Sequence, residues 1–78
     1  MDVGYMEFST YVNGNKRADV VRSVGEPTNR TWGVRYSIGE DNFGIEWYDG
    51  KSESYAENAA ENFVEGIKTT VNNHIVKS

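Results

Sequence analysis

Regularly spaced carboxylates are the most distinctive chemical feature of this sequence. Four glutamates recur at every fourth position: Glu53, Glu57, Glu61 and Glu65. On a helix, side chains four residues apart lie on the same face about 6 Å from each other, and like charges there cost roughly 0.2 to 0.5 kcal/mol per pair. The pattern predicts either a solvated helix face that keeps a small protein soluble, or an acidic surface that binds a basic partner.

Other residues are expected to extend this acidic surface. Glu40 and Asp41 lie in a predicted hairpin loop, and Asp49 follows the second strand of that hairpin. Arg35 and Tyr48 are predicted on the outer face of the same hairpin. We expect these five residues and the four glutamates to form the partner-binding surface.

The residues needed for catalysis are sparse. The chain has one histidine, His74, and no cysteine, and no serine stands in a nucleophile-elbow or Ser-Lys setting. The loop from residue 39 to 42 is too short for a calcium loop, which needs about twelve residues, and no phosphate-binding glycine motif is found. We therefore expect a protein that is not an enzyme and has no cofactor or metal.

The balance of charge disfavours nucleic acid as a partner. The 78 residues carry 12 acidic and 8 basic side chains, for a net charge of −4. The C-terminal half, residues 39–78, holds eight of the acids and three of the lysines. Such a surface repels nucleic acid and anionic membranes and attracts basic proteins.

The length predicts a single domain over residues 1–78. Without cysteine, neither a disulfide nor a thiolate metal site can supplement the small core. No apolar run reaches the roughly 18 residues of a membrane span, and the N-terminus lacks signal-peptide features. We expect a cytoplasmic protein, in the host cytoplasm if the chain is encoded by a phage.

A hairpin over residues 31–51 organises the predicted fold. Apolar side chains alternate along both of its strands: Trp32, Val34, Tyr36 and Ile38, then Phe43, Ile45 and Trp47. With a four-residue loop over 39–42, all seven share one face, which a helix would cover. In this register Arg35 is opposite Glu46 and Gly33 is opposite Tyr48.

An earlier hairpin is predicted from the turn signal Asn13-Gly14-Asn15. It joins a strand over residues 5–12 to a second strand over 16–24. A three-residue turn would place Phe8 opposite Val20 and Thr10 opposite Ala18. The alternative is a short helix over residues 17–24, since its valines also fit helical spacing.

The C-terminal segment predicts a long helix from about Ser54 to Ile75, with Ser54 as the N-cap and Glu57 closing a capping box. Its apolar residues form one stripe: Ala56, Ala60, Phe63, Val64, Ile67, Val71 and Ile75. The predicted fold class is therefore α+β, with a four-stranded antiparallel sheet of two hairpins packed on one C-terminal helix.

Three functions are compatible with these features. The first is a small acidic non-catalytic protein that binds and modulates or inhibits another protein, of the kind phages use to take over a host, acting as a DNA-mimic-like blocker of a nucleic-acid-handling protein. The second is an RNA- or DNA-binding module that uses an exposed sheet face with Tyr5, Tyr11, Arg35 and Tyr48. The third is a homodimeric or larger structural assembly.

Overall fold

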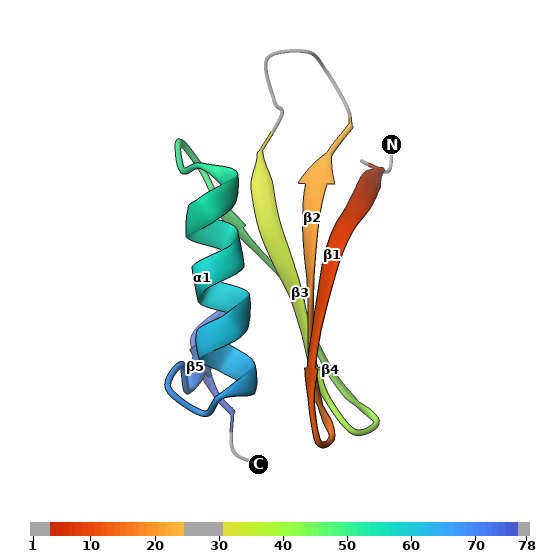
Figure 1. Cartoon of the computed structure of the whole chain (residues 1–78), viewed down its shortest axis with the longest axis vertical. Coiled ribbons are helices and arrows are strands. Elements are labelled where there is room, and N and C mark those ends of the chain that lie inside the picture. Colours follow the sequence, from red (N-terminus) through yellow and green to blue (C-terminus); the bar gives the residue numbers. More distant parts are fainter. Residues whose placement is uncertain (1–3, 25–30, 77–78) are drawn as a thin grey trace.

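The computed structural model describes residues 4–24 and 31–76. Their helix and strands follow one another as β1 (Tyr5–Asn13), β2 (Lys16–Ser23), β3 (Trp32–Ile38), β4 (Asp41–Tyr48), α1 (Glu53–Val64), β5 (Thr70–Val71) and β6 (His74–Ile75). The first four strands form an antiparallel sheet in the order β1-β2-β3-β4, and β5 pairs with β6 (Figure 1). The predicted α+β class, with a four-stranded sheet packed against one helix, is confirmed.

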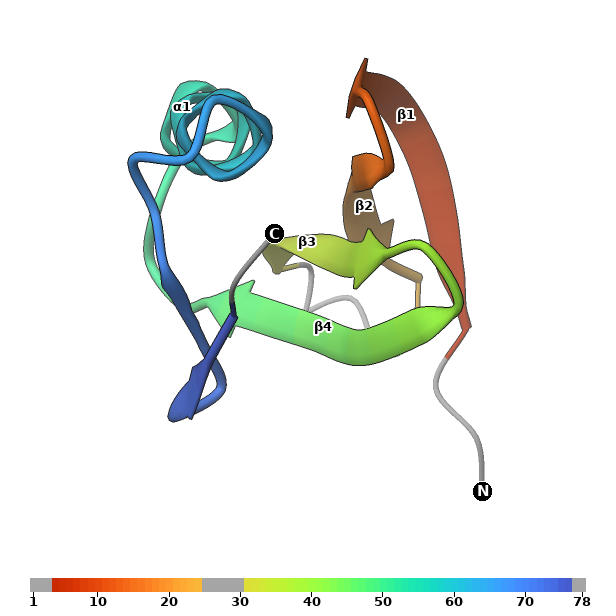
Figure 2. The same ribbon diagram turned by 90° about the horizontal axis from the view of Figure 1, so that it is seen from below.

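The core lies between the sheet and α1. Figure 2 shows that the sheet is strongly curved and that α1 lies on its concave side. Val20, Val34 and Tyr36 from the sheet are fully buried there. They face Ala60 and Phe63 of the helix, and the rings of Tyr36 and Phe63 lie 4.6 Å apart. Burial of each large apolar side chain stabilises the fold by about 1.5 to 3 kcal/mol.

The first hairpin is confirmed, and residues 16–23 form a strand rather than a helix. Its predicted register is wrong by one residue. Asn13 pairs directly with Lys16 across a two-residue turn in which Gly14 has φ of 65°, so Tyr11 is opposite Ala18. A β-bulge between Glu7 and Ser9 then shifts the register again, which adds to the curvature of the sheet.

The register of the second hairpin also differs from the prediction. Strands β3 and β4 are joined by two residues, not four, because Ile38 already pairs with Asp41. Beyond a bulge at Phe43, Gly33 is opposite Trp47, and Glu46 is opposite Val34. Ile45 and Trp47 therefore lie on the face away from α1, and Trp47 is 40% exposed. The bulge leaves Phe43 packed against the core.

Helix α1 is shorter than predicted and begins two residues earlier. Ser52, not Ser54, is the N-cap, and its hydroxyl accepts a hydrogen bond from the Tyr55 backbone N–H. The helix ends at Val64 because Gly66 adopts φ of 84°. The Gly66 N–H donates to the Phe63 carbonyl, and the next N–H, of Ile67, donates to the Asn62 carbonyl. This pair of bonds is a Schellman motif, the common way a glycine ends a helix.

The remainder of the predicted helix forms the short hairpin of β5 and β6. Asn72 and Asn73 connect the strands with positive φ angles of 48° and 69°, as a type I′ turn requires. The predicted apolar stripe ends here, since Ile67 and Ile75 are 67% and 73% exposed, whereas Val71 is buried. His74 lies in β6 and is exposed.

The two outer strands of the sheet differ in the hydrogen bonding of their outer edges. The side-chain amide of Asn72 donates to the carbonyl oxygens of Phe43 and Ile45 on β4, at 3.3 and 3.2 Å. Asn72 therefore occupies backbone acceptors along the outer edge of β4. Strand β1 is the other outer strand and, within residues 4–24 and 31–76, pairs with β2 along one side only. Its second side presents the unpaired backbone groups of an edge strand.

The register of β3 and β4 can be tested at Gly33. A Cβ atom there would lie 2.6 Å from the Trp47 ring and 2.9 Å from the Glu46 carbonyl oxygen. We expect Gly33→Ala to lower the free energy of unfolding by about 1 to 3 kcal/mol, measured by urea unfolding. Adding Trp47→Ala should relieve part of this cost, whereas adding Tyr48→Ala should not. Relief by Tyr48→Ala alone would support the register with Gly33 opposite Tyr48.

Candidate functional site

Helix α1 presents three different sides. One side is buried against the sheet and consists of Ala56, Ala60, Phe63 and Val64. The second side carries the acidic ridge, defined as Glu53, Glu57, Glu61 and Glu65. Glu57 is half-buried and the other three ridge residues are exposed. The ridge follows the predicted spacing of four, although Glu65 is the C-cap residue and not part of a longer helix.

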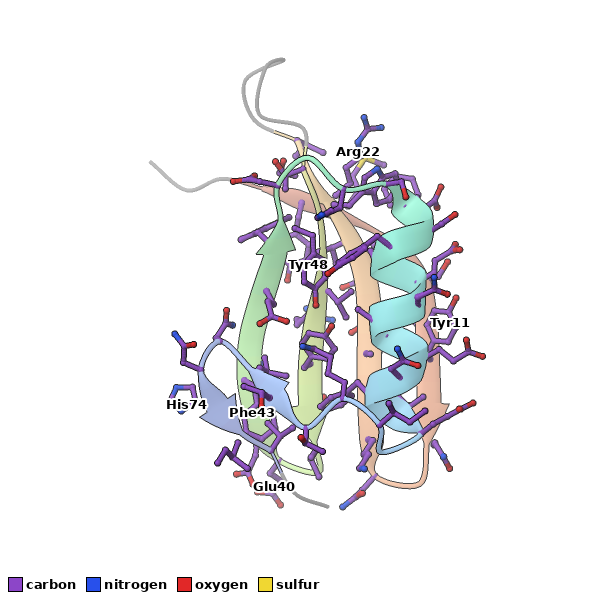
Figure 3. All side chains as sticks on the ribbon, turned by 90° about the vertical axis from the view of Figure 1, so that its left-hand side faces the viewer. Tyr11, Arg22, Glu40, Phe43, Tyr48 and His74 are labelled. Carbon is purple, nitrogen blue, oxygen red and sulfur yellow. The ribbon has the colours of Figure 1, made fainter. Side chains whose placement is uncertain are left out.

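The acidic ridge runs beside β1. Figure 3 shows Tyr11 of β1 next to α1, and Tyr48 on the opposite side of the helix, toward β4. Burial raises the pKa of Tyr11, and the negative charges of Glu57, Glu61 and Glu53 raise that pKa further. The potential of the ridge therefore extends over the helix-facing side of β1. The sequence alone did not predict this neighbourhood, because Tyr11 was expected on the outer face of the sheet.

The third side of α1 faces β4 and is largely uncharged. A hollow of about 290 Å³ lies there, lined by Tyr48, Tyr55, Asn58, Ala59, Asn62 and Lys68. The rings of Tyr48 and Tyr55 meet edge to face with their centroids 5.2 Å apart. The acidic character of the helix is thus confined to the side toward β1.

A buried carboxylate connects the strands on the face of the sheet that points away from α1. Asp19 of β2 is 1% exposed. Its Oδ1 atom accepts hydrogen bonds from the Thr10 hydroxyl at 2.8 Å and from Arg17 Nε at 3.2 Å. Its Oδ2 atom accepts bonds from Nε and Nη2 of Arg35 at 3.2 and 2.8 Å. This Asp19 cluster links β1, β2 and β3, because its members come from all three strands.

The hydrogen bonds within the Asp19 cluster favour the ionised form of Asp19. Burial alone would raise the pKa of Asp19, but bonds from Thr10, Arg35 and Arg17 outweigh burial and leave the pKa below its usual value. Arg35 also donates to the Tyr5 hydroxyl at 2.8 Å and to Glu7 at 2.9 Å. Every charged group of the cluster therefore has an internal partner, which is typical of a structural ion-pair network.

A second carboxylate, Glu46, connects β4 to the C-terminal segment. Its Oε1 atom accepts a hydrogen bond from the Tyr48 hydroxyl at 2.7 Å and pairs with Lys68 Nζ at 2.9 Å. Its Oε2 atom accepts the Asn72 backbone N–H at 3.0 Å. Burial opposes ionisation, yet these bonds lower the pKa of Glu46. Burial also raises the pKa of Tyr48 and of Tyr36, whose hydroxyls are hydrogen-bonded to each other.

The structure separates residues that the sequence analysis grouped together. Arg35 and Tyr48 were expected on one outer face, but they lie on opposite faces of the sheet. Tyr48 is opposite Trp32 and shares its face. Arg35 is an odd number of residues from Trp32 on the same strand, so it points to the other face. The predicted pairing of Arg35 with Glu46 is therefore wrong: Arg35 binds Asp19, and Glu46 binds Lys68.

The acids of the second hairpin do not gather at one end of the molecule. Glu40 and Asp41 lie at the turn between β3 and β4, whereas Asp49 follows the far end of β4. Eight residues of strand separate these ends, which corresponds to about 25 Å. Asp49 accepts a hydrogen bond from the Thr31 hydroxyl at 3.3 Å. The nine predicted binding residues thus form several separate sites, of which the acidic ridge is the largest.

The pairing of charges distinguishes the ridge from the other acids. Within residues 4–24 and 31–76, the salt bridges join Arg17 and Arg35 to Asp19, Arg35 to Glu7, and Lys68 to Glu46. No ridge glutamate takes part in a salt bridge there. In the same part of the chain, no three histidine, cysteine or acidic side chains are grouped as metal ligands. The ridge is the largest run of carboxylates left to interact with something outside the chain.

The position of Asp19 in the sequence could have predicted the Asp19 cluster. Asp19 stands beside Val20 and Val21 in a strand whose middle is buried. A carboxylate at such a position needs a charged partner. Arg35, at the matching position of the neighbouring strand, is that partner, since Asp19 and Arg35 are directly opposite.

The Asp19 cluster predicts a specific loss of stability. We expect Asp19→Asn to lower the free energy of unfolding at pH 7 by about 1.5 to 3 kcal/mol, because it replaces the ionised acceptor of the hydrogen bonds from Thr10, Arg17 and Arg35. Glu7→Gln, which removes an exposed partner of the same arginine, should cost less than about 1 kcal/mol. Urea unfolding of both variants and the natural chain provides the comparison.

The same comparison should depend on pH. The pKa of Asp19 is lowered in the folded state, so its contribution is complete above its unfolded pKa, about 3.9, and is lost as the pH falls below that value. The difference between Asp19→Asn and the natural chain should therefore shrink from pH 7 to pH 3. A constant difference would contradict a charged Asp19 in the folded protein.

Comparisons with protein-family models, characterised protein sequences and solved structures found no match to this chain. No helix in the described part of the chain has the length and apolar character needed to cross a membrane.

Proposed function

We propose that this chain is a non-catalytic protein-binding domain that modulates or inhibits a basic, nucleic-acid-handling protein through its acidic ridge. The observation that carries the proposal is the distribution of ion pairs. Arg17, Arg35 and Lys68 are held by carboxylates inside the molecule, whereas the ridge carboxylates have no cationic partner among the described residues. Complementary charges across an interface increase association rate and specificity.

The spacing of the ridge limits how closely it can imitate DNA. Carboxylates four residues apart on a helix are separated by about 6 Å along its axis. Phosphates along one DNA strand are separated by about 3.4 Å of helix axis. The ridge therefore has about half the linear charge density of a DNA strand. This supports mimicry in the sign and linear order of the charges, with an affinity that falls as salt is added.

The alternative of a nucleic-acid-binding face has less support. It required Tyr5, Tyr11, Arg35 and Tyr48 to share one exposed side of the sheet. Tyr5 and Arg35 do lie together, but the arginine is held by Asp19 and Glu7. Tyr11 lies close to the negative charges of the ridge. Tyr48 lies on the helix-facing side of the sheet, where its hydroxyl donates a hydrogen bond to Glu46.

The proposal can be tested with two variants that change net charge equally. The ridge variant carries Glu57→Gln and Glu61→Gln, and the control variant carries Glu40→Gln and Asp41→Asn at the turn between β3 and β4. Each immobilised form is exposed to a bacterial lysate, and the affinities of the retained proteins are then measured by titration. We expect the ridge variant to weaken binding of a retained basic protein about tenfold, equivalent to about 1.4 kcal/mol, with little change for the control.

DNA should compete with the chain for the same partner, and binding should weaken between low and physiological salt. An equal loss in both variants would show that only net charge matters. Unchanged binding in the ridge variant would remove the ridge from the interface. Either of these two results contradicts the proposed function.

A further inference from the structure

The two edges of the sheet differ in their capacity to bind another strand. Asn72 occupies carbonyl groups on the outer side of β4. Strand β1 is the opposite outer strand. Within β1, the segment 9–13 follows the bulge and pairs regularly with β2, and it contains no lysine or proline of the kind that protects edge strands. This segment can accept a further strand.

The two faces beside this edge have different chemistry. Tyr11 faces the helix, since it is opposite the core residue Ala18 and its pKa responds to the ridge glutamates. Asn13 also reaches the helix and donates to the Val64 carbonyl at 3.0 Å. On the other face, Thr10 bonds Asp19, and Val12 is 63% exposed. A strand added here would meet carboxylates on one face and an apolar side chain on the other.

A second copy of the chain fits this edge poorly. Antiparallel pairing of two β1 strands places both helices on the same face of the combined sheet. Because each ridge lies on the β1 side of its helix, the two rows of glutamates would then face each other. Like charges in such an arrangement repel when they approach within the Debye length, about 8 Å at physiological ionic strength. Charge complementarity instead favours a basic strand.

We infer that the edge of β1 binds an extended segment of the partner protein in which basic and apolar residues alternate. The basic side chains lie on the helix side, toward Glu57 and Glu61, and the apolar side chains lie beside Val12. Main-chain hydrogen bonds to residues 9–13 provide affinity, and alternate side chains provide specificity, as in other cases of strand addition. This inference rests on the proposed function and specifies how the partner is engaged.

The test uses a seven-residue peptide in which lysine and valine alternate, acetylated and amidated at its ends. The ¹⁵N-labelled chain is titrated with it and followed by NMR. We expect shifts in the amide signals of residues 9–13 and of the ridge, and slower hydrogen exchange at β1 amides. A peptide of the same composition without alternation should bind more weakly. Glu57→Gln with Glu61→Gln should weaken binding of the alternating peptide, and Glu40→Gln with Asp41→Asn should not.

Backbone methylation separates strand pairing from simple charge attraction. In an extended strand, the N–H groups of alternate residues point to opposite edges. One peptide is N-methylated at every valine and the other at every lysine, with the charge unchanged. Pairing with β1 requires one of them to bind at least about tenfold more weakly than the parent, while the other binds almost as well.

The remaining outcomes would overturn the inference. Equal binding of both methylated peptides would show that the ridge binds cations without strand pairing, and the proposed function would stand. If the alternating peptide fails to bind while binding of a lysate protein still depends on the ridge, the inference of strand pairing is wrong and the proposed function stands. A doubled mass in light scattering, lost on addition of Val12→Lys, would show that a second copy occupies the edge.

Discussion

The buried carboxylate of Asp19 is the constraint on which the sheet depends. A carboxylate without exposure to water is costly unless hydrogen bonds and an opposite charge compensate it. Its partners come from β1, from β2 itself and from β3. The three strands can satisfy Asp19 only when Thr10 and Arg35 lie on the same face as it does. That requirement places the alternate residues, such as Val20 and Tyr36, on the face covered by α1.

This arrangement has a consequence for the surface. Two carboxylates, Asp19 and Glu46, bind Arg17, Arg35 and Lys68 inside the molecule or at its margins. These cations are then unable to neutralise α1, although the chain as a whole carries eight basic side chains. The ion pairs that stabilise the fold therefore leave the acidic ridge without a salt-bridge partner among the described residues.

The sequence was sufficient to predict the elements and the class of the fold. Alternating apolar residues identify the strands, and the alanines with Phe63 and Val64 identify the buried side of the helix. The registers could not be predicted, because both turns have two residues and each hairpin carries a bulge. The turn of the first hairpin is one residue shorter than predicted and that of the second is two residues shorter, and each bulge shifts the register by one residue. Sequence periodicity does not reveal such shifts. The predicted helix, from about Ser54 to Ile75, is too long because Gly66 ends α1 with a positive φ.

The candidate site shows a similar limit. The positions of the ridge follow from the spacing of four, so Glu57 and Glu61 could be named from the sequence. The proximity of these glutamates to Tyr11 depends on the orientation of α1 on the sheet. That orientation is determined by packing between segments that are far apart in the sequence. The expected grouping of Arg35 with Tyr48 failed for the same reason as the register, since a slip of one residue moves a side chain to the other face.

The side chain of Asn72 has a consequence for assembly. A sheet with two available edges can add molecules at both ends, and repeated addition of that kind produces fibres. With the carbonyls of Phe43 and Ile45 already occupied, the edge of β4 is less available than that of β1 among the described residues. Strand addition of the kind proposed for β1 is therefore opposed at β4 by a side chain of the same molecule, which disfavours growth from both edges.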